Sequence, residues 1–151
     1  MQYIVIPLAT ILVAVIGSLW VNQGLASWYG TIAKPAWTPG GGVIGAVWTI
    51  LYILIATSAI LAYNKLKGKE RTTVMAWFVV NGVLNAKWNL LFFSLHWIGT
   101  SLFEILVLEF TIVALIHLLW NKARIAAYLL IPYALWVAFA SYLTYSVWRL
   151  Q

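Results

Sequence analysis

The chain has 151 residues, of which 64% are hydrophobic and 8% are charged, and its formal net charge is +6. A soluble domain has about 45–50% apolar and about 25% charged residues, so this composition excludes a soluble globule, a disordered chain and a basic nucleic-acid-binding domain. It indicates an integral membrane protein. At about 20 residues a span, the length suits five spanning helices in one domain, residues 1–151.

Apolar runs predict the membrane-spanning helices. In chain order they cover about residues 3–21, 43–63, 72–95, 100–119 and 125–148. Each run is expected to be helical because lipid offers no partner for backbone groups, and the alternation typical of a membrane β-barrel is absent. The expected fold class is therefore all-α, a polytopic five-helix bundle.

The connection between the first two runs, residues 22–42, is unusually long. It carries two prolines and three consecutive glycines, which are typical of loops, together with Trp28, Tyr29 and Trp37. A plain linker would not carry so many aromatic residues. We expect this segment to fold over one end of the bundle as a lid.

Basic residues in the short loops predict the orientation in the membrane. Those on the side of the N-terminus are Lys65, Lys67, Lys69, Arg71, Lys122 and Arg124. The opposite side holds only Lys34 and Arg149. We therefore expect a cytoplasmic N-terminus and an external lid.

The third run carries Asn81, Asn85 and Asn89 at four-residue spacing, with Trp88 beside them. At 100° per residue these side chains share one face of a helix, which we expect to point into the bundle. Two interpretations remain open at this stage. The amides are either interhelical hydrogen-bonding groups or the wall of a polar and aromatic pocket.

Two further aromatic faces occur on other runs. The fifth run places on one face Trp136, Phe139, Ala140, Leu143 and Val147. Ala140 is small enough to leave a recess there, although ordinary helix packing would produce the same pattern. Trp48 and Tyr52 form a third patch on the second run.

Three ionisable residues, Lys87, Glu104 and Glu109, lie within apparent spans, where such groups are costly and are functional candidates. If the chain turns near Ile98, then Lys87 and Glu109 lie at equal depth on neighbouring helices. We therefore predict an ion pair between them.

Metal and nucleophile chemistry have little support. The chain has no cysteine and no aspartate, and His96 and His117 stand alone without a carboxylate at ligand spacing. We expect no metal site and no required cofactor.

Several motifs together resemble one family of membrane proteins. In chain order they are Trp28-Tyr29, the Lys-Pro-Ala-Trp-Thr-Pro segment 34–39, Gly-Ala-Val-Trp 45–48, Asn85 with Trp88, Pro132-Tyr133 with Trp136, and Tyr-Ser-Val-Trp-Arg 145–149. This combination resembles the translocator protein family, also called TspO or tryptophan-rich sensory proteins, over nearly the whole chain.

The resemblance implies a five-helix bundle, usually a homodimer, in a prokaryotic cell membrane. It also implies a pocket under the first loop for porphyrins, and in some members for sterols or synthetic ligands. Protoporphyrin IX or haem is the expected ligand. The residues that match the family's pocket are Trp48, Asn85, Trp88, Ala140 and Leu143. The facing aromatic walls that a flat porphyrin needs would also include Trp136 and Phe139.

Three functions remain open on these grounds. The first is a porphyrin-binding sensor or transporter. The second is a light-dependent porphyrin-degrading enzyme, because Trp28 and Trp136 match the tryptophans that the resemblance connects with that reaction. The third is an ion-coupled carrier that uses the membrane carboxyl groups. Separately, Leu143, Tyr145 and Arg149 fit a cholesterol-contact pattern.

Overall fold

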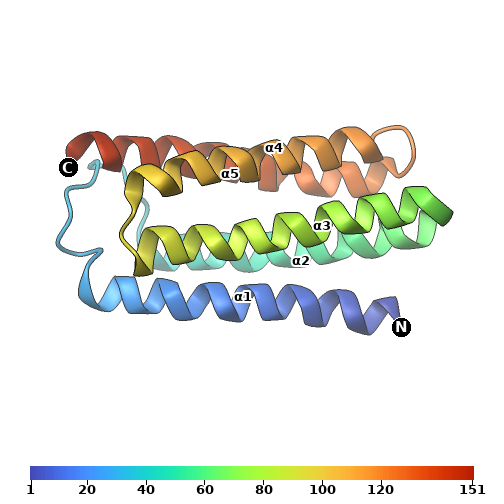
Figure 1. Cartoon of the computed structure of the whole chain (residues 1–151), viewed down its shortest axis with the longest axis horizontal. Helices are drawn as coiled ribbons and strands as arrows, with labels where there is room; N and C mark the ends of the chain where they lie inside the picture. The colour runs from blue at the N-terminus through green and yellow to red at the C-terminus, as the bar shows by residue number, and fades with distance from the viewer.

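The computed structural model describes residues 1–151, and they form an all-helical bundle. Its elements are α1 (Gln2–Ser27), α2 (Gly41–Lys65), α3 (Gly68–Asn89), the π-helical segment η1 (Leu90–Ser94), α4 (Ile98–Leu119) and α5 (Arg124–Leu150). Because η1 continues α3, the chain makes five long helices that run along a common axis (Figure 1). The predicted fold class is confirmed. By length and composition α1, α2, α4 and α5 could each cross a membrane, and α3 lies alongside them.

The long connection is shorter than predicted. Helix α1 extends to Ser27 and α2 begins at Gly41, so the loop comprises residues 28–40 instead of 22–42. The reason is a tertiary contact in the last turns of α1. A Cβ atom on Gly24 would lie 2.6 Å from the carbonyl oxygen of Phe93 in η1. Since this contact holds the chain against η1, the helix continues past the apolar run.

The core of the bundle lies between α4 and α5, with α2 and α3 packed against them. Its buried side chains include Ile105, Leu108, Ile112 and Leu115 from α4 and Ala127, Leu130, Tyr133 and Val137 from α5. Helix α1 is different, because its only buried residues are Gly17 and Gly24. It is a peripheral helix that approaches its neighbours through its backbone.

The turn between α3 and α4 comes earlier than predicted. Helix α3 ends in the π-helical segment, where the Leu95 N–H donates to the Leu90 carbonyl at 2.9 Å. The chain then reverses at His96, which has a left-handed φ of 59°, a conformation that histidine adopts more readily than most residues. The centre of the turn is therefore near residue 96 and not near Ile98.

This shift makes the predicted ion pair between Lys87 and Glu109 wrong. Lys87 lies nine residues before His96 and Glu104 lies eight after it, so Glu104 is closer in depth. The one salt bridge in the chain joins Lys122, in the loop between α4 and α5, to Glu70 in the first turn of α3, 2.6 Å apart.

Candidate functional site

A continuous hydrogen-bond network crosses the middle of the bundle. The Tyr52 hydroxyl donates to Asn85 Oδ1 at 2.8 Å, and Asn85 Nδ2 donates to the Tyr133 hydroxyl at 3.1 Å. The Tyr133 hydroxyl in turn donates to Asn81 Oδ1 at 3.1 Å, and Asn81 Nδ2 donates to Thr111 Oγ1 at 2.8 Å. These residues belong to α2, α3, α4 and α5. Two of the three asparagines therefore connect helices, as the first of the two interpretations predicted.

The third asparagine meets α1. Asn89 Nδ2 donates to the carbonyl of Asn85 at 3.1 Å within α3. A Cβ atom on Gly17 would lie 2.8 Å from this same nitrogen. Gly17 therefore lets α1 come close enough to cover Asn89.

An aromatic cluster joins the start of the 28–40 loop to the end of α3. The ring of Trp28 stacks on His96 with centroids 4.2 Å apart and meets the edge of Phe92 at 5.5 Å. Trp88 stacks on the same Phe92 at 5.2 Å. Tyr29 packs against Phe93 at 5.5 Å. We call these residues the η1 cluster.

A second aromatic cluster joins the far part of the loop to α5. Trp37 stacks on Tyr142 at 5.4 Å and meets the edge of Phe139 at 5.9 Å, and Trp136 lies 5.3 Å from Phe139. We call these residues the α5 cluster. The loop thus lies across one end of the bundle, from η1 to α5, beside the C-terminus (Figure 1).

Lys34 is the cation of this loop. Its Nζ donates to the Ile32 carbonyl at 3.1 Å and lies 4.7 Å from the centroid of the Tyr29 ring. Burial raises the pKa of the Tyr29 phenol, so this group stays neutral at physiological pH. The ammonium is held inside the loop and faces no acidic partner.

The structure divides the predicted pocket residues between these regions. Trp88 belongs to the η1 cluster, whereas Trp136 and Phe139 belong to the α5 cluster. Trp48 and Asn85 lie at the hydrogen-bond network, where Trp48 packs 5.6 Å from Tyr52 and 6.2 Å from Tyr133.

The remaining predicted residues lie on α5. Ala140 packs against the core and Leu143 is partly buried. The two tryptophans predicted for porphyrin degradation are in different clusters, because Trp28 stacks on His96 and Trp136 packs on Phe139.

Several buried polar side-chain atoms of the bundle have no hydrogen-bond partner. The indole nitrogens of Trp88 and Trp136 are buried and make no hydrogen bond. The same is true of both carboxylate oxygens of Glu104 and of one carboxylate oxygen of Glu109. Buried polar groups are paired in the great majority of cases, so such atoms mark places where a ligand could supply a partner. Sequence reasoning singled out these four residues but not their lack of partners, since pairing depends on neighbours from other helices.

The residues of the predicted sterol motif lie on the outside of α5. Tyr145 and Arg149 line a shallow groove of about 430 Å³, together with residues of the loop such as Trp37. Leu143 is not part of this groove. The motif therefore describes a surface where the loop meets α5.

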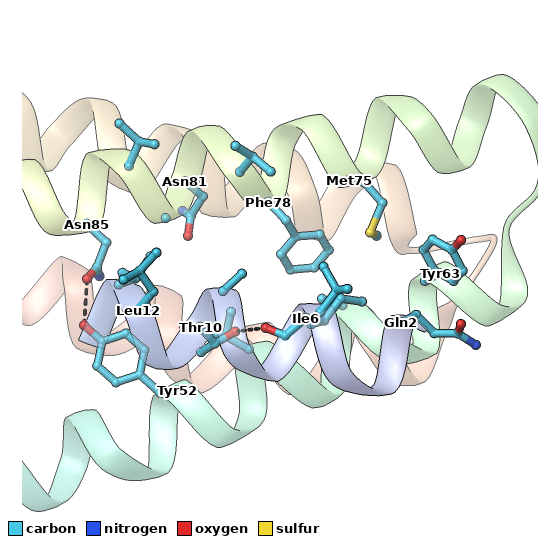
Figure 2. A pocket seen from close by; sticks show the side chains of 18 of the residues that line it. Gln2, Ile6, Thr10, Leu12, Tyr52, Tyr63, Met75, Phe78, Asn81 and Asn85 are labelled. Atoms are coloured by element: carbon cyan, nitrogen blue, oxygen red, sulfur yellow. Dashed lines mark hydrogen bonds between the residues drawn. The ribbon is translucent and has the colours of Figure 1, made fainter. Parts of the chain in front are cut away.

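A cavity of about 440 Å³ lies elsewhere, between α1, α2 and α3 in the half of the bundle that contains the N-terminus (Figure 2). Asn85 is the one predicted pocket residue that lines it. Sequence reasoning missed this cavity, because it depends on how far α1 stands from its neighbours.

Together these features define a polytopic helical membrane protein with aromatic clusters under a loop at one end. Residues 4–149 match the TspO/MBR family, and the chain belongs to this family. It is 35% identical to the Tryptophan-rich protein TspO of Bacillus cereus, over 83% of this chain and 81% of that protein. It is 30% identical to the Tryptophan-rich protein TspO of Archaeoglobus fulgidus, over 95% and 93%. The human Translocator protein is 32% identical, over 89% and 80%. The resemblance predicted from the motifs is confirmed.

Proposed function

We propose that this membrane protein binds porphyrins, such as protoporphyrin IX or haem, and other flat apolar molecules beneath the 28–40 loop, and that it acts in their sensing or transport. The observation that carries the proposal is the pair of indole N–H groups, of Trp88 on α3 and Trp136 on α5, that are buried without an acceptor. Two relatives are named Translocator protein and Tryptophan-rich protein TspO, which agrees with a transport or ligand-handling role.

The chemistry of a porphyrin matches these groups. It is a large flat π-system that needs aromatic walls, and the η1 and α5 clusters supply them on opposite sides of the bundle end. Its carboxylates need donors. The two indole N–H groups are available, and Lys34 supplies a cation in the covering loop.

The test is a titration of the purified chain in detergent or nanodiscs, followed by the Soret absorbance of protoporphyrin IX. The double variant Trp88→Phe, Trp136→Phe keeps two aromatic rings and removes both N–H groups. We expect roughly tenfold weaker binding, since each buried hydrogen bond contributes about 0.5–1.5 kcal/mol. The matched control is Trp120→Phe, which lies at the other end of the bundle and is 39% exposed. Equal affinity of the double variant and the control would overturn the proposal.

We also propose that the N-terminus faces the cytoplasm of a prokaryotic cell. The basic residues that support this orientation lie in the loops and adjoining helix ends at the same end of the bundle as the N-terminus, where α2 meets α3 and α4 meets α5 (Figure 1). Labelling of single cysteines placed at Lys67 and at Gly30 with an impermeant maleimide tests it. We expect labelling of Gly30→Cys alone in intact cells. Labelling of Lys67→Cys alone would show that the N-terminus faces the outside.

A homodimer is the remaining part of the proposal. Gly82 and Ala86, two small residues four apart on α3, are of the kind that lets helices of two copies approach closely. They do not support a dimer here, because Gly82 faces Val13 of α1 within the same chain, where a Cβ atom would lie 3.3 Å away. Mass measurement of the purified protein in nanodiscs tests the dimer directly. A monomeric mass at every protein concentration would refute it.

A further inference from the structure

The cavity between α1, α2 and α3 has one polar end deep in the bundle, and Gln2 and Tyr63 line its other end. It follows α1 from Gln2 to Val13, about 17 Å at 1.5 Å per residue. Apolar side chains line most of its length. Figure 2 shows Tyr52, Asn81 and Asn85 together at its deep end, near the middle of the bundle.

The cavity exists because α1 is held at both ends of it. At the deep end, Val13 lies close to Gly82, and Gly17 lies against Asn89. At the other end, side-chain hydrogen bonds tie α1 to α2. Gln2 Nε2 donates to Asn64 Oδ1 at 3.0 Å, and Asn64 Nδ2 donates to the Tyr3 hydroxyl at 2.8 Å. Between these contacts α1 stands away from its neighbours.

The cavity opens sideways, toward lipid. Its exposed lining residues are on α1 and α3, where Leu12 is 59% exposed and Val79 is 66% exposed. The wall formed by α2 is closed, and Ala59 there is 5% exposed. A ligand would therefore enter from the bilayer, between α1 and α3.

The deep end has unused hydrogen-bonding capacity. A carboxamide carries two N–H donors, and Asn81 and Asn85 each use one, toward Thr111 and Tyr133. The Tyr52 hydroxyl donates to Asn85 and accepts nothing within the chain. An unpaired donor in apolar surroundings is costly, so an oxygen acceptor suits this end of the cavity.

We propose that this cavity binds a chain-like, lipid-soluble molecule with one uncharged terminal hydroxyl group, of the long-chain alcohol class. The oxygen lies against Asn81, Asn85 and Tyr52, and the chain follows α1 toward the N-terminal side. The oxygen is uncharged because an ionised group at this depth costs about 2.5–3.5 kcal/mol or more. At about 30 Å³ for a water-sized group, 440 Å³ holds a chain of roughly fifteen such groups. This site is separate from the aromatic clusters, so it stands independently of the porphyrin proposal.

The experiment is photo-crosslinking of the whole chain in nanodiscs with a hexadecanol analogue that carries a diazirine beside its hydroxyl group. We expect adducts on α1 around residues 10–13 and on α3 around residues 78–85. Excess unlabelled hexadecanol should remove them, and protoporphyrin IX should not. Adducts spread equally over the exposed faces of α4 and α5 would overturn the proposal.

Two neighbouring substitutions provide a matched pair. Ala9→Trp fills the cavity, because Ala9 lines it, and should reduce labelling at least fivefold. Leu8→Trp is the control, since Leu8 is 59% exposed and does not line the cavity. Ala9→Leu replaces the tryptophan variant if that protein does not fold. Equal labelling of the filled variant and the control would overturn the proposed site.

A third arm tests the oxygen. A hexadecane analogue with the diazirine at the same carbon lacks the hydroxyl group, and Tyr52→Phe removes one of its partners. We expect severalfold weaker labelling in each case. If the hydrocarbon labels the same residues as efficiently as the alcohol, the polar end does not select the ligand and the assigned chemistry is wrong.

Discussion

Replacing Tyr133 by phenylalanine removes one hydroxyl group from the centre of the hydrogen-bond network. This side chain is 1% exposed, and its hydroxyl donates to Asn81 Oδ1 and accepts from Asn85 Nδ2, both at 3.1 Å. Two hydrogen bonds are lost together. Side-chain hydrogen bonds inside membrane proteins average about 0.6 kcal/mol, with a maximum of about 1.7 kcal/mol. We therefore expect the free energy of unfolding to fall by about 1–3 kcal/mol.

The assay is equilibrium unfolding in mixed micelles of increasing SDS content, followed by helical circular dichroism. The matched control is Tyr142→Phe on the same helix, where the residue is 61% exposed and its stacking on Trp37 survives the change. The control should change the free energy of unfolding by less than about 0.5 kcal/mol. If Tyr133→Phe proves as stable as the control, the network does not hold the four helices together.

Three further substitutions test the packing and the charges. Gly24→Ala should lower the free energy of unfolding by about 1–3 kcal/mol, because the new Cβ would lie 2.6 Å from the Phe93 carbonyl oxygen. The control Gly30→Ala should not, because a Cβ atom there would have nothing within 4 Å. Equal unfolding curves for the two variants would contradict the close contact at Gly24. Glu109→Gln should leave the yield of folded protein unchanged on gel filtration, because Glu109 has no salt bridge. A sharp fall in yield would support the ion pair between Glu109 and Lys87. Glu70→Gln should change the free energy of unfolding by only about 0–1 kcal/mol, since both partners of its salt bridge are about half exposed. A larger loss in SDS unfolding would show that this pair holds the start of α3 to the loop between α4 and α5.

The membrane location and the helical class followed from composition and hydropathy alone. Both depend on the hydropathy of each segment taken by itself, because in lipid each apolar stretch must satisfy its own backbone hydrogen bonds. The asparagine stripe of α3 was also predictable, since a spacing of four residues places Asn81 and Asn85 on one helical face. Their inward orientation needed no knowledge of the other helices.

The partners of these residues were decided by the tertiary structure. Tyr52 and Tyr133 come from other helices, and no spacing within α3 indicates which hydroxyl will reach which amide. The register of α3 and α4 likewise depended on a π-helical segment and a left-handed His96, which moved the turn and separated Lys87 from Glu109.

The end point of α1 and the cavity along its first half were likewise decided by the tertiary structure. Hydropathy predicted a helix over residues 3–21, but the contact of Gly24 with Phe93 extends it to Ser27. The distance of α1 from α2 and α3 follows from glycine contacts at one end and the Gln2–Asn64 hydrogen bond at the other. A sequence determines which groups can meet lipid or one another along one helix, whereas the space between helices depends on close contacts between residues far apart in the chain.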